Sequence, residues 1–129
     1  MHSVIIYGNI TPFATTVLPV LRDERCELIA HGKTVLDIYK RVAEQRPDIA
    51  ILLPGGDTEP EAKLENFLKS LGVTVVVLGQ PDERGVVSAK MRSRDFDVAG
   101  HILLPNLRIS LTHQLRRSQV LRKRGGVSA

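Results

Sequence analysis

Two short apolar runs limit what this chain can fold into more than any other feature of its sequence. Residues 49–53 read IAILL and residues 73–78 read VTVVVL, so nearly every position is hydrophobic. A strand that is apolar at every position, rather than at every second one, has both faces buried, as in a parallel sheet covered by helices. The two runs therefore predict the central strands of an α/β domain.

Shorter strand and helix signals flank these runs. Apolar residues at three- and four-residue spacing indicate amphipathic helices, and Gly, Pro and Asn residues mark the turns between segments. Because short apolar strands alternate with helices, the chain predicts a five-stranded parallel sheet in a doubly wound, flavodoxin-like three-layer sandwich. We expect strands at 4–7, 26–30, 49–53, 73–78 and 98–103, and helices at 12–21, 35–45, 60–71, 83–94 and from 105 onward.

Chain length and cysteine content bear on the domain count and the compartment. The 129 residues suffice for one domain with its own core. The single cysteine, Cys26, has no internal partner for a disulfide, which fits a reducing compartment. No apolar run approaches the ~18 residues of a membrane span, and residues 1–4 lack the basic start of a signal peptide. We therefore expect a cytoplasmic protein with no membrane span.

Charge is distributed unevenly along the chain. Residues 98–129 contain no Asp or Glu. Their basic side chains favour either contact with nucleic-acid phosphates or an interaction with the negative end of a helix dipole. Residues 125–129 read GGVSA, so we expect a domain at 1–121 followed by a basic, glycine-containing linker at 122–129 within a longer protein. The basic patch consists of Arg108, Arg116, Arg117, Arg122, Lys123 and Arg124.

Two short motifs and the order of the predicted elements give the chain a resemblance to a known family. Residues 31–33 (HGK) precede a predicted helix, residues 46–53 read RPDIAILL, and residues 101–105 read HILLP. In this order they resemble the receiver domains of bacterial response regulators, over nearly the whole chain. Receivers hold Mg²⁺ with acidic residues after the first strand and accept a phosphoryl group on an Asp at the end of the third.

At the receiver positions this sequence lacks the functional groups. Gly8 and Asn9 replace the acidic pair, Leu53 replaces the phosphoryl acceptor, Gly79 replaces the hydroxyl residue and Leu104 replaces the lysine. A leucine side chain can neither bind Mg²⁺ nor accept a phosphoryl group. The resemblance therefore implies a pseudo-receiver without catalytic residues, metal or cofactor.

Other reactive side chains offer weaker alternatives. Asp57 and Glu59 could supply displaced carboxylates with Asn9 opposite them, although acidic residues in such a turn more often cap a helix. The histidines show no metal-ligand spacing, and Cys26 has no base near it in sequence, so we expect packed or surface residues. These histidines are His2, His31, His101 and His113.

The C-terminal helix carries more apolar residues than one buried face needs. By the resemblance, signalling surfaces lie around the last strand and helix. Here one interpretation is that Leu107, Leu111 and Leu115 cover the sheet, and the other is that a heptad-like seam pairs with a second copy or a partner. The candidate interaction residues are Leu107, Ile109, Leu111, Gln114, Leu115, Ser118 and Leu121, with Leu104 at the start of the seam.

These observations lead to one functional hypothesis and two alternatives. The chain is similar to the degenerate receiver domains at the N-terminus of pilus-assembly and localisation ATPases of the TadZ and CpaE type. We therefore expect a non-enzymatic, phosphorylation-independent module that acts by protein–protein contact, as a homodimer, within a larger bacterial protein. The alternatives are a nucleic-acid-binding module that uses the basic patch and a flavodoxin-like ligand-binding domain that uses Gly8, Asn9 and residues 54–56 as a cradle.

Overall fold

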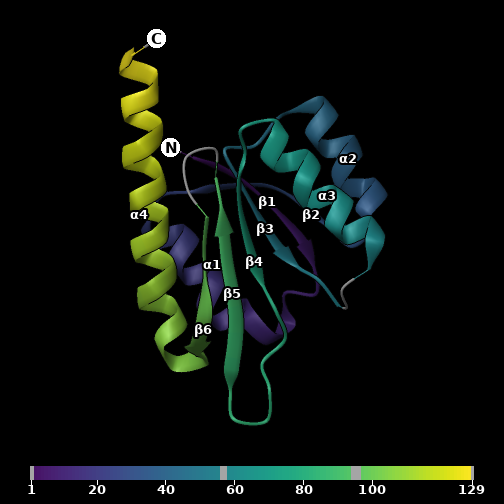
Figure 1. Cartoon of the computed structure of the whole chain (residues 1–129), viewed down its shortest axis with the longest axis vertical. Helices are drawn as coiled ribbons and strands as arrows, with labels where there is room; N and C mark the ends of the chain where they lie inside the picture. Colours follow the sequence, from purple (N-terminus) through teal and green to yellow (C-terminus); the bar gives the residue numbers. More distant parts are fainter. Residues whose placement is uncertain (1, 56–57, 94–96, 129) are drawn as a thin grey trace.

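The computed structural model describes residues 2–55, 58–93 and 97–128, with side chains described up to residue 117. It is a six-stranded mixed sheet in the order β2-β1-β3-β4-β5-β6, with α2 and α3 on one side and α1 and α4 on the other (Figure 1). The strands are β1 Ser3–Gly8, β2 Glu27–Gly32, β3 Ile49–Leu53, β4 Thr74–Leu78, β5 Val86–Arg92 and β6 Asp97–Leu103. The helices are the 3-10 turn η1 Thr11–Phe13, then α1 Ala14–Asp23, α2 Val35–Glu44, α3 Glu59–Ser70 and α4 Leu104–Ser128.

The first four strands form the parallel half of the sheet, as the sequence predicts. β1 pairs with β2 and with β3, and β3 pairs with β4, all in parallel. All five residues of β3 are buried, which confirms the interpretation of the apolar run at 49–53. Because β1 lies next to both β2 and β3, the connections leave it in opposite directions, which places the switch point of the topology between β1 and β3.

The prediction of a five-stranded, fully parallel sheet is wrong. A helix was expected at 83–94, but β5 occupies that segment and pairs antiparallel with both β4 and β6. The reason is a tight turn before β5. The Asp82 Oδ1 atom accepts hydrogen bonds from the backbone N–H groups of Arg84 at 2.8 Å and Val86 at 2.9 Å. The bond from Val86 contributes most to lowering the pKa of the Asp82 carboxyl.

Once that turn has formed, the side chains of β5 alternate as a strand requires. Val87 and Met91 are buried towards α4, whereas Ser88 is exposed on the other face. Two successive antiparallel pairings also make β6 run in the same direction as β1 to β4. The last predicted strand thus has the expected direction, although β5 separates it from β4.

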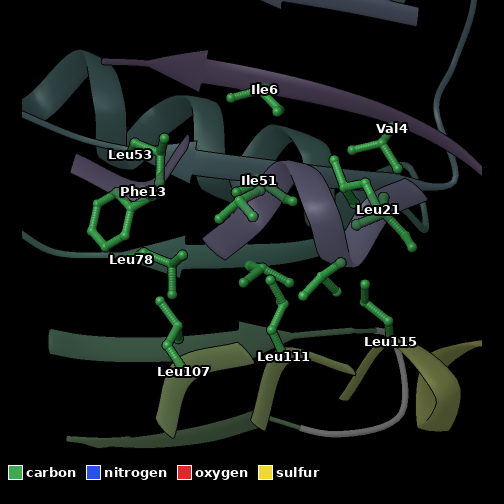
Figure 2. Close-up of a cluster of buried hydrophobic side chains, with 14 of the residues drawn as sticks. Val4, Ile6, Phe13, Leu21, Ile51, Leu53, Leu78, Leu107, Leu111 and Leu115 are labelled. Atoms are coloured by element: carbon green, nitrogen blue, oxygen red, sulfur yellow. The ribbon is translucent and has the colours of Figure 1, made fainter. Parts of the chain in front are cut away.

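Two apolar cores lie on opposite faces of the sheet. The larger joins α1 and α4 to β1, β3, β4 and β5, and Figure 2 shows Leu107, Leu111 and Leu115 pointing from α4 into it. The smaller joins α2 and α3 to the other face. In the first helical segment, Phe13 is fully buried in the larger core, whereas Leu18 of α1 is 41% exposed.

Side-chain caps set the beginnings of two helices. The Thr34 Oγ1 atom accepts a hydrogen bond from the Asp37 N–H group at the start of α2. At the start of α3, Thr58 and Glu61 form a reciprocal capping box. The first helix begins later than the predicted residue 12, because Thr11–Phe13 form a 3-10 turn and α1 starts at Ala14.

Candidate functional site

The carboxyl ends of the parallel strands surround an open pocket of about 680 Å³. It lies at the switch point between β1 and β3, where ligands bind in doubly wound sheets. The backbone of β1 comes very close to β3 there: Gly8 has φ +103°, and a Cβ atom at this position would collide with the Leu53 carbonyl oxygen. Glycine is therefore a structural requirement at the floor of the pocket.

The structure brings together only some of the five receiver-type positions. Gly8, Asn9 and Leu53 line the pocket, and the Leu53 side chain is 1% exposed and belongs to the core. Gly79 instead donates its N–H group to the Ser88 carbonyl oxygen, and Leu104 donates its N–H group to Gly85 at the far side of β5. The inserted strand thus separates Leu104 from Gly79, so these five positions do not form one site.

The polar groups around this pocket can form hydrogen bonds and supply one ammonium group. The His31 Nε2 atom lies 2.7 Å from the Gly8 carbonyl oxygen, which can only accept, so this nitrogen carries the proton. The Asn9 Oδ1 atom accepts a hydrogen bond from the Thr11 N–H group. Lys33 and Gln80 complete the rim. The sequence places Gln80 in a turn at the end of a strand, but it assigns no role to this residue, because a lone amide carries no distinctive pattern.

The alternative carboxylates do not gather at the pocket in the described part of the chain. The Glu59 carboxylate is 79% exposed and pairs with the Lys63 Nζ atom along α3, at 3.1 Å. Asp57 lies outside the described residues. No group of three or more His, Cys, Asp and Glu side chains among the described residues is arranged to hold a metal ion. Burial, followed by the nearby Glu24 carboxylate, raises the pKa of the Cys26 thiol.

A second polar cluster lies between α3 and the sheet, beside a pocket of about 190 Å³. The Tyr7 hydroxyl donates a hydrogen bond to the Glu61 Oε2 atom at 2.9 Å. Burial raises the pKa of Tyr7 to about 12, and the bond to Glu61 adds to this effect. Glu61 also accepts from the Thr58 hydroxyl, so both of its oxygen atoms are occupied. This cluster therefore fastens α3 to β1.

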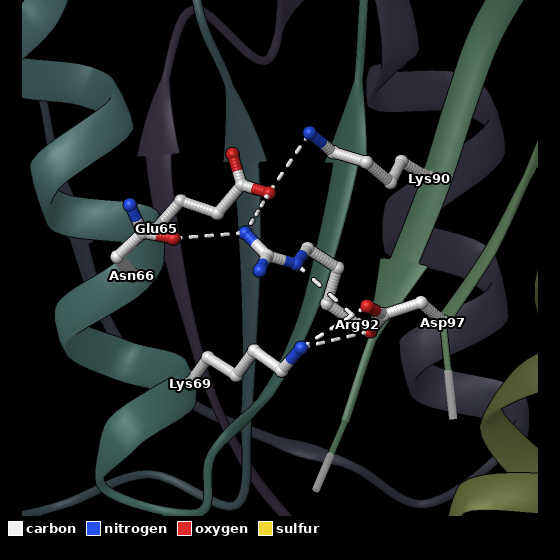
Figure 3. Close-up of polar contacts among 6 residues, drawn as sticks. All are labelled: Glu65, Asn66, Lys69, Lys90, Arg92 and Asp97. Carbon is white, nitrogen blue, oxygen red and sulfur yellow. Dashed lines mark hydrogen bonds and ion pairs between the residues drawn. The ribbon is translucent and has the colours of Figure 1, made fainter. Parts of the chain in front are cut away.

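Charged side chains join α3 to the β5–β6 hairpin (Figure 3). The Glu65 Oε1 atom lies 2.9 Å from the Lys90 Nζ atom and 3.0 Å from the Arg92 Nη1 atom. Lys69 bonds to Asp97 at the start of β6, at 3.0 Å. These contacts attach the hairpin to the parallel half of the molecule.

The predicted interaction residues of α4 divide between the core and the surface. Leu107, Leu111 and Leu115 are at most 3% exposed, so their packing matches the interpretation that they cover the sheet. Ile109 is 76% exposed, and Gln114 is half-buried with its Oε1 atom lacking a hydrogen-bond partner among the described residues. The side chains of Ser118 and Leu121 lie outside the described part of the chain.

Two residues of the basic patch pair with acidic groups at the end of α1. The Arg108 Nη2 atom lies 2.8 Å from the Asp23 Oδ2 atom, and the Arg116 Nη2 atom lies 2.9 Å from the Glu24 Oε1 atom. Both arginines therefore hold α4 against α1 and are partly neutralised towards phosphates. Arg117 is exposed. The side chains of Arg122, Lys123 and Arg124 are not described.

The outer strand β6 is the most exposed element of the sheet. Six of its seven residues are exposed and Ile102 is half-buried, and β6 ends the strand order. An apolar pocket of about 120 Å³ lies beside it, between the hairpin and α4. Its lining includes Val98, Gly100, Ile102, Leu107, Leu111 and Gln114.

Within the described ranges, no helix has both the length and the apolar character that crossing a membrane requires. No protein-family model, no curated protein and no solved structure matches this chain. Its function is therefore inferred from the geometry of two places, the pocket at the ends of the parallel strands and the open edge at β6.

Proposed function

We propose that this chain is a non-enzymatic interaction module that binds a protein partner through the open edge at β6. The observation that carries the proposal is a regular seven-residue edge strand that contains no lysine, no proline and no register shift. Unpaired backbone N–H and C=O groups along such an edge bind another strand readily. Natural proteins block long regular edges with charges, prolines or bulges unless the edge is used.

The opposite edge of the sheet provides a comparison. β2 is also an edge strand, but its pairing with β1 shifts register between Val4 and Ile5. An edge that is interrupted by a register shift pairs less readily with another chain. The contrast supports β6 as the edge that meets a partner.

The pocket at the carboxyl ends of the parallel strands supports the non-enzymatic part of the proposal. Gly8 has no side chain, Leu53 is buried in the core, and Asn9 uses its carbonyl oxygen to hold Thr11. These groups cannot accept a phosphoryl group as a receiver carboxylate does. We therefore retain the pseudo-receiver hypothesis for the parallel half, the strands β2-β1-β3-β4.

The proposal also includes a role and a compartment. A pseudo-receiver that acts by contact would suit the localisation part of a larger bacterial protein, as in the pilus-assembly ATPases that the sequence resembles. The lone Cys26 fits a reducing cytoplasm.

Exposure to a phosphodonor tests the non-enzymatic part directly. We expect intact-mass spectra of the whole chain to remain unchanged after incubation with acetyl phosphate and Mg²⁺. A true receiver domain treated in parallel is the positive control. Stoichiometric gain of a phosphoryl group on an aspartate would overturn the proposal, whatever the oligomeric state of the chain.

A second candidate function rests on the pocket of about 680 Å³ at the switch point. Its position and its polar rim favour a small anionic ligand, held by Lys33 and by hydrogen bonds from Gln80. Titration with inorganic phosphate and with a nucleoside monophosphate, followed by NMR, tests this function. Saturable shifts at Gly8 and Asn9 that are lost in Lys33→Ala would support it, and unchanged spectra at millimolar ligand would exclude it.

A further inference from the structure

We propose that the partner at β6 is a second copy of this chain, paired antiparallel about a two-fold axis at Gly100. This inference rests on the proposed function and deepens it, because it names the occupant of the edge and the register. The result is one continuous sheet through two molecules.

The direction of the free backbone groups follows from the pairing with β5. The Leu104 N–H group donates to the Gly85 carbonyl oxygen at 2.8 Å, so these two residues form a hydrogen-bonded pair. Hydrogen-bonded and non-hydrogen-bonded pairs alternate along an antiparallel ladder. Residues 98, 100 and 102 therefore bond to β5, and the backbone groups of residues 97, 99 and 101 point to the open edge. Leu103 adds only its N–H group there, because its carbonyl oxygen accepts the first hydrogen bond of α4, which begins at Leu104.

These outward groups are complementary to themselves. With the axis at Gly100, Asp97 of one copy faces Leu103 of the other, and Ala99 faces His101. Every outward-pointing residue then meets another outward-pointing residue, which gives about six main-chain hydrogen bonds by the antiparallel pattern, because the Leu103 carbonyl oxygens belong to α4. A shift by one residue would oppose outward groups to inward ones and lose these bonds.

Gly100 has no explanation within the single chain. Its φ is not positive, and a Cβ atom added there would meet nothing within 4 Å. Glycine inside a strand weakens it and often marks a place where another backbone approaches closely. At the proposed axis, the two Gly100 residues form a non-hydrogen-bonded pair, the closest type, with Cα atoms ~4.5 Å apart.

The side chains around the axis suit a second copy as well. Val98 is 36% exposed and lines the apolar pocket beside α4 with Ile102. In the proposed register, Val98 of each copy faces Ile102 of the other, so both pockets are covered by apolar side chains. This burial supplies the apolar contact that main-chain hydrogen bonds alone lack.

Charge is compatible with this register. The register places no two like charges opposite each other, and it sets Asp97 of one copy diagonally next to His101 of the other on the same face. Because the two-fold axis is perpendicular to the sheet, the two α4 helices lie on the same face of the joined sheet. Their residues Arg108 and Arg116 are paired with Asp23 and Glu24 of their own copy, which weakens the repulsion between the two helices.

The solution mass of four forms of the full chain tests this arrangement. Light scattering over a concentration series should give twice the chain mass of 14.3 kDa for the wild type. Gly100→Glu should give the monomer mass, because it places two like charges opposite each other at the axis. Leu36→Glu and Ile109→Glu, at residues 62% and 76% exposed, should leave the dimer intact. Circular dichroism confirms that each variant is folded.

A register-specific cross-link gives a second readout. In a Cys26→Ser background, Gly100→Cys should form an intermolecular disulfide on mild oxidation, because facing Cα atoms ~4.5 Å apart lie within disulfide range. The control Leu103→Cys should remain monomeric on non-reducing gels, because residue 103 of one copy lies far from residue 103 of the other.

Three outcomes would overturn the inference. They are a monomeric wild type at every concentration, a dimer that Ile109→Glu dissociates and Gly100→Glu does not, and cross-linking at Leu103→Cys rather than at Gly100→Cys. A monomer that shows no phosphorylation would refute the self-pairing and leave the non-enzymatic proposal standing. The two ideas can therefore fail separately.

Discussion

The parallel half and the β5–β6 hairpin of this sheet reach stability by different routes. All five residues of β3 are buried, whereas six of the seven residues of β6 are exposed. β3 is held by strands on both sides and by helices on both faces. β6 is held by one neighbouring strand, by α4 on one face and by a few ion pairs. The comparison shows that the core of the parallel half fixes the fold, while the outer strand of the hairpin keeps an open edge.

Core truncation should show the largest difference between the two halves. Ile51→Ala in β3 should lower the free energy of unfolding by about 3–4 kcal/mol, because it leaves a cavity in a fully buried strand. Val98→Ala in β6 should lower it by less than about 1 kcal/mol, since that side chain is partly exposed. Chemical denaturation measures both. Equal losses would show that the hairpin is as tightly packed as the central strands.

Glycine substitutions compare a constrained turn with an open one. Gly8→Ala should lower the free energy of unfolding by at least about 2 kcal/mol, because the new Cβ atom meets the Leu53 carbonyl oxygen and the residue has an unfavourable φ. Gly85 has φ +78°, and a Cβ atom added there would meet nothing within 4 Å. Gly85→Ala should therefore lower the free energy of unfolding by about 1 kcal/mol, from backbone strain alone. Thermal denaturation ranks the two variants. A smaller loss for Gly8→Ala than for Gly85→Ala would contradict the close approach of β1 and β3.

Glu65 tests the junction between the two halves. Its side chain is 12% exposed and pairs with Arg92, which is 23% exposed. Glu65→Gln should lower the free energy of unfolding by about 1–2 kcal/mol, because it leaves two cations without their shared partner. Glu59→Gln is the matched control, and its exposed pair with Lys63 should change stability by less than about 0.5 kcal/mol. Additive effects of Glu65→Gln and Arg92→Gln in a double-mutant cycle would show that the pair carries no coupling.

Tyr7 gives the parallel half a dependence on alkaline pH. Its pKa rises from 10.0 to about 12 in the folded protein, so the folded state holds the phenol proton more tightly than the unfolded chain does. This stabilisation is complete below pH 10 and is lost as the pH rises towards 12. Tyr7→Phe should therefore lower the free energy of unfolding by about 1 kcal/mol at neutral pH, because it removes the hydrogen bond to Glu61. Above pH 10, the free energy of unfolding of Tyr7→Phe should fall less steeply than that of the wild type. Curves of unfolding free energy against pH that run parallel for the two proteins would contradict this expectation.

Local sequence signals predicted the parallel half well, because each of its strands and helices is specified by residues within it or directly next to it. The run at 49–53 is apolar throughout, and Thr34 and Thr58 supply caps within three residues of their partners. The hairpin was harder, because residues 86–92 (VVSAKMR) begin with two apolar residues and fit either a short helix or a strand. Alternation of Val87, Ala89 and Met91 was the signal that could have identified the strand.

The candidate sites divide in the same way. The residues at the ends of the parallel strands could be named in advance, because the carboxyl ends of parallel strands meet at one edge. The separation of Leu104 from Gly79 could not, because it depends on a strand inserted between them. The open edge at β6 was also missed, because the sequence of a strand does not show whether the strand lies at the edge or in the centre of the sheet.

The order of apolar and polar residues in this chain specifies an α/β fold, its central strands and its capped helices, because each of these depends on neighbours a few residues apart. Long-range pairing specifies the rest. Residues 86–92 are a strand because β4 and β6 offer backbone partners on both sides. Leu107, Leu111 and Leu115, rather than Ile109, face the core because α1 and the sheet meet that side of α4.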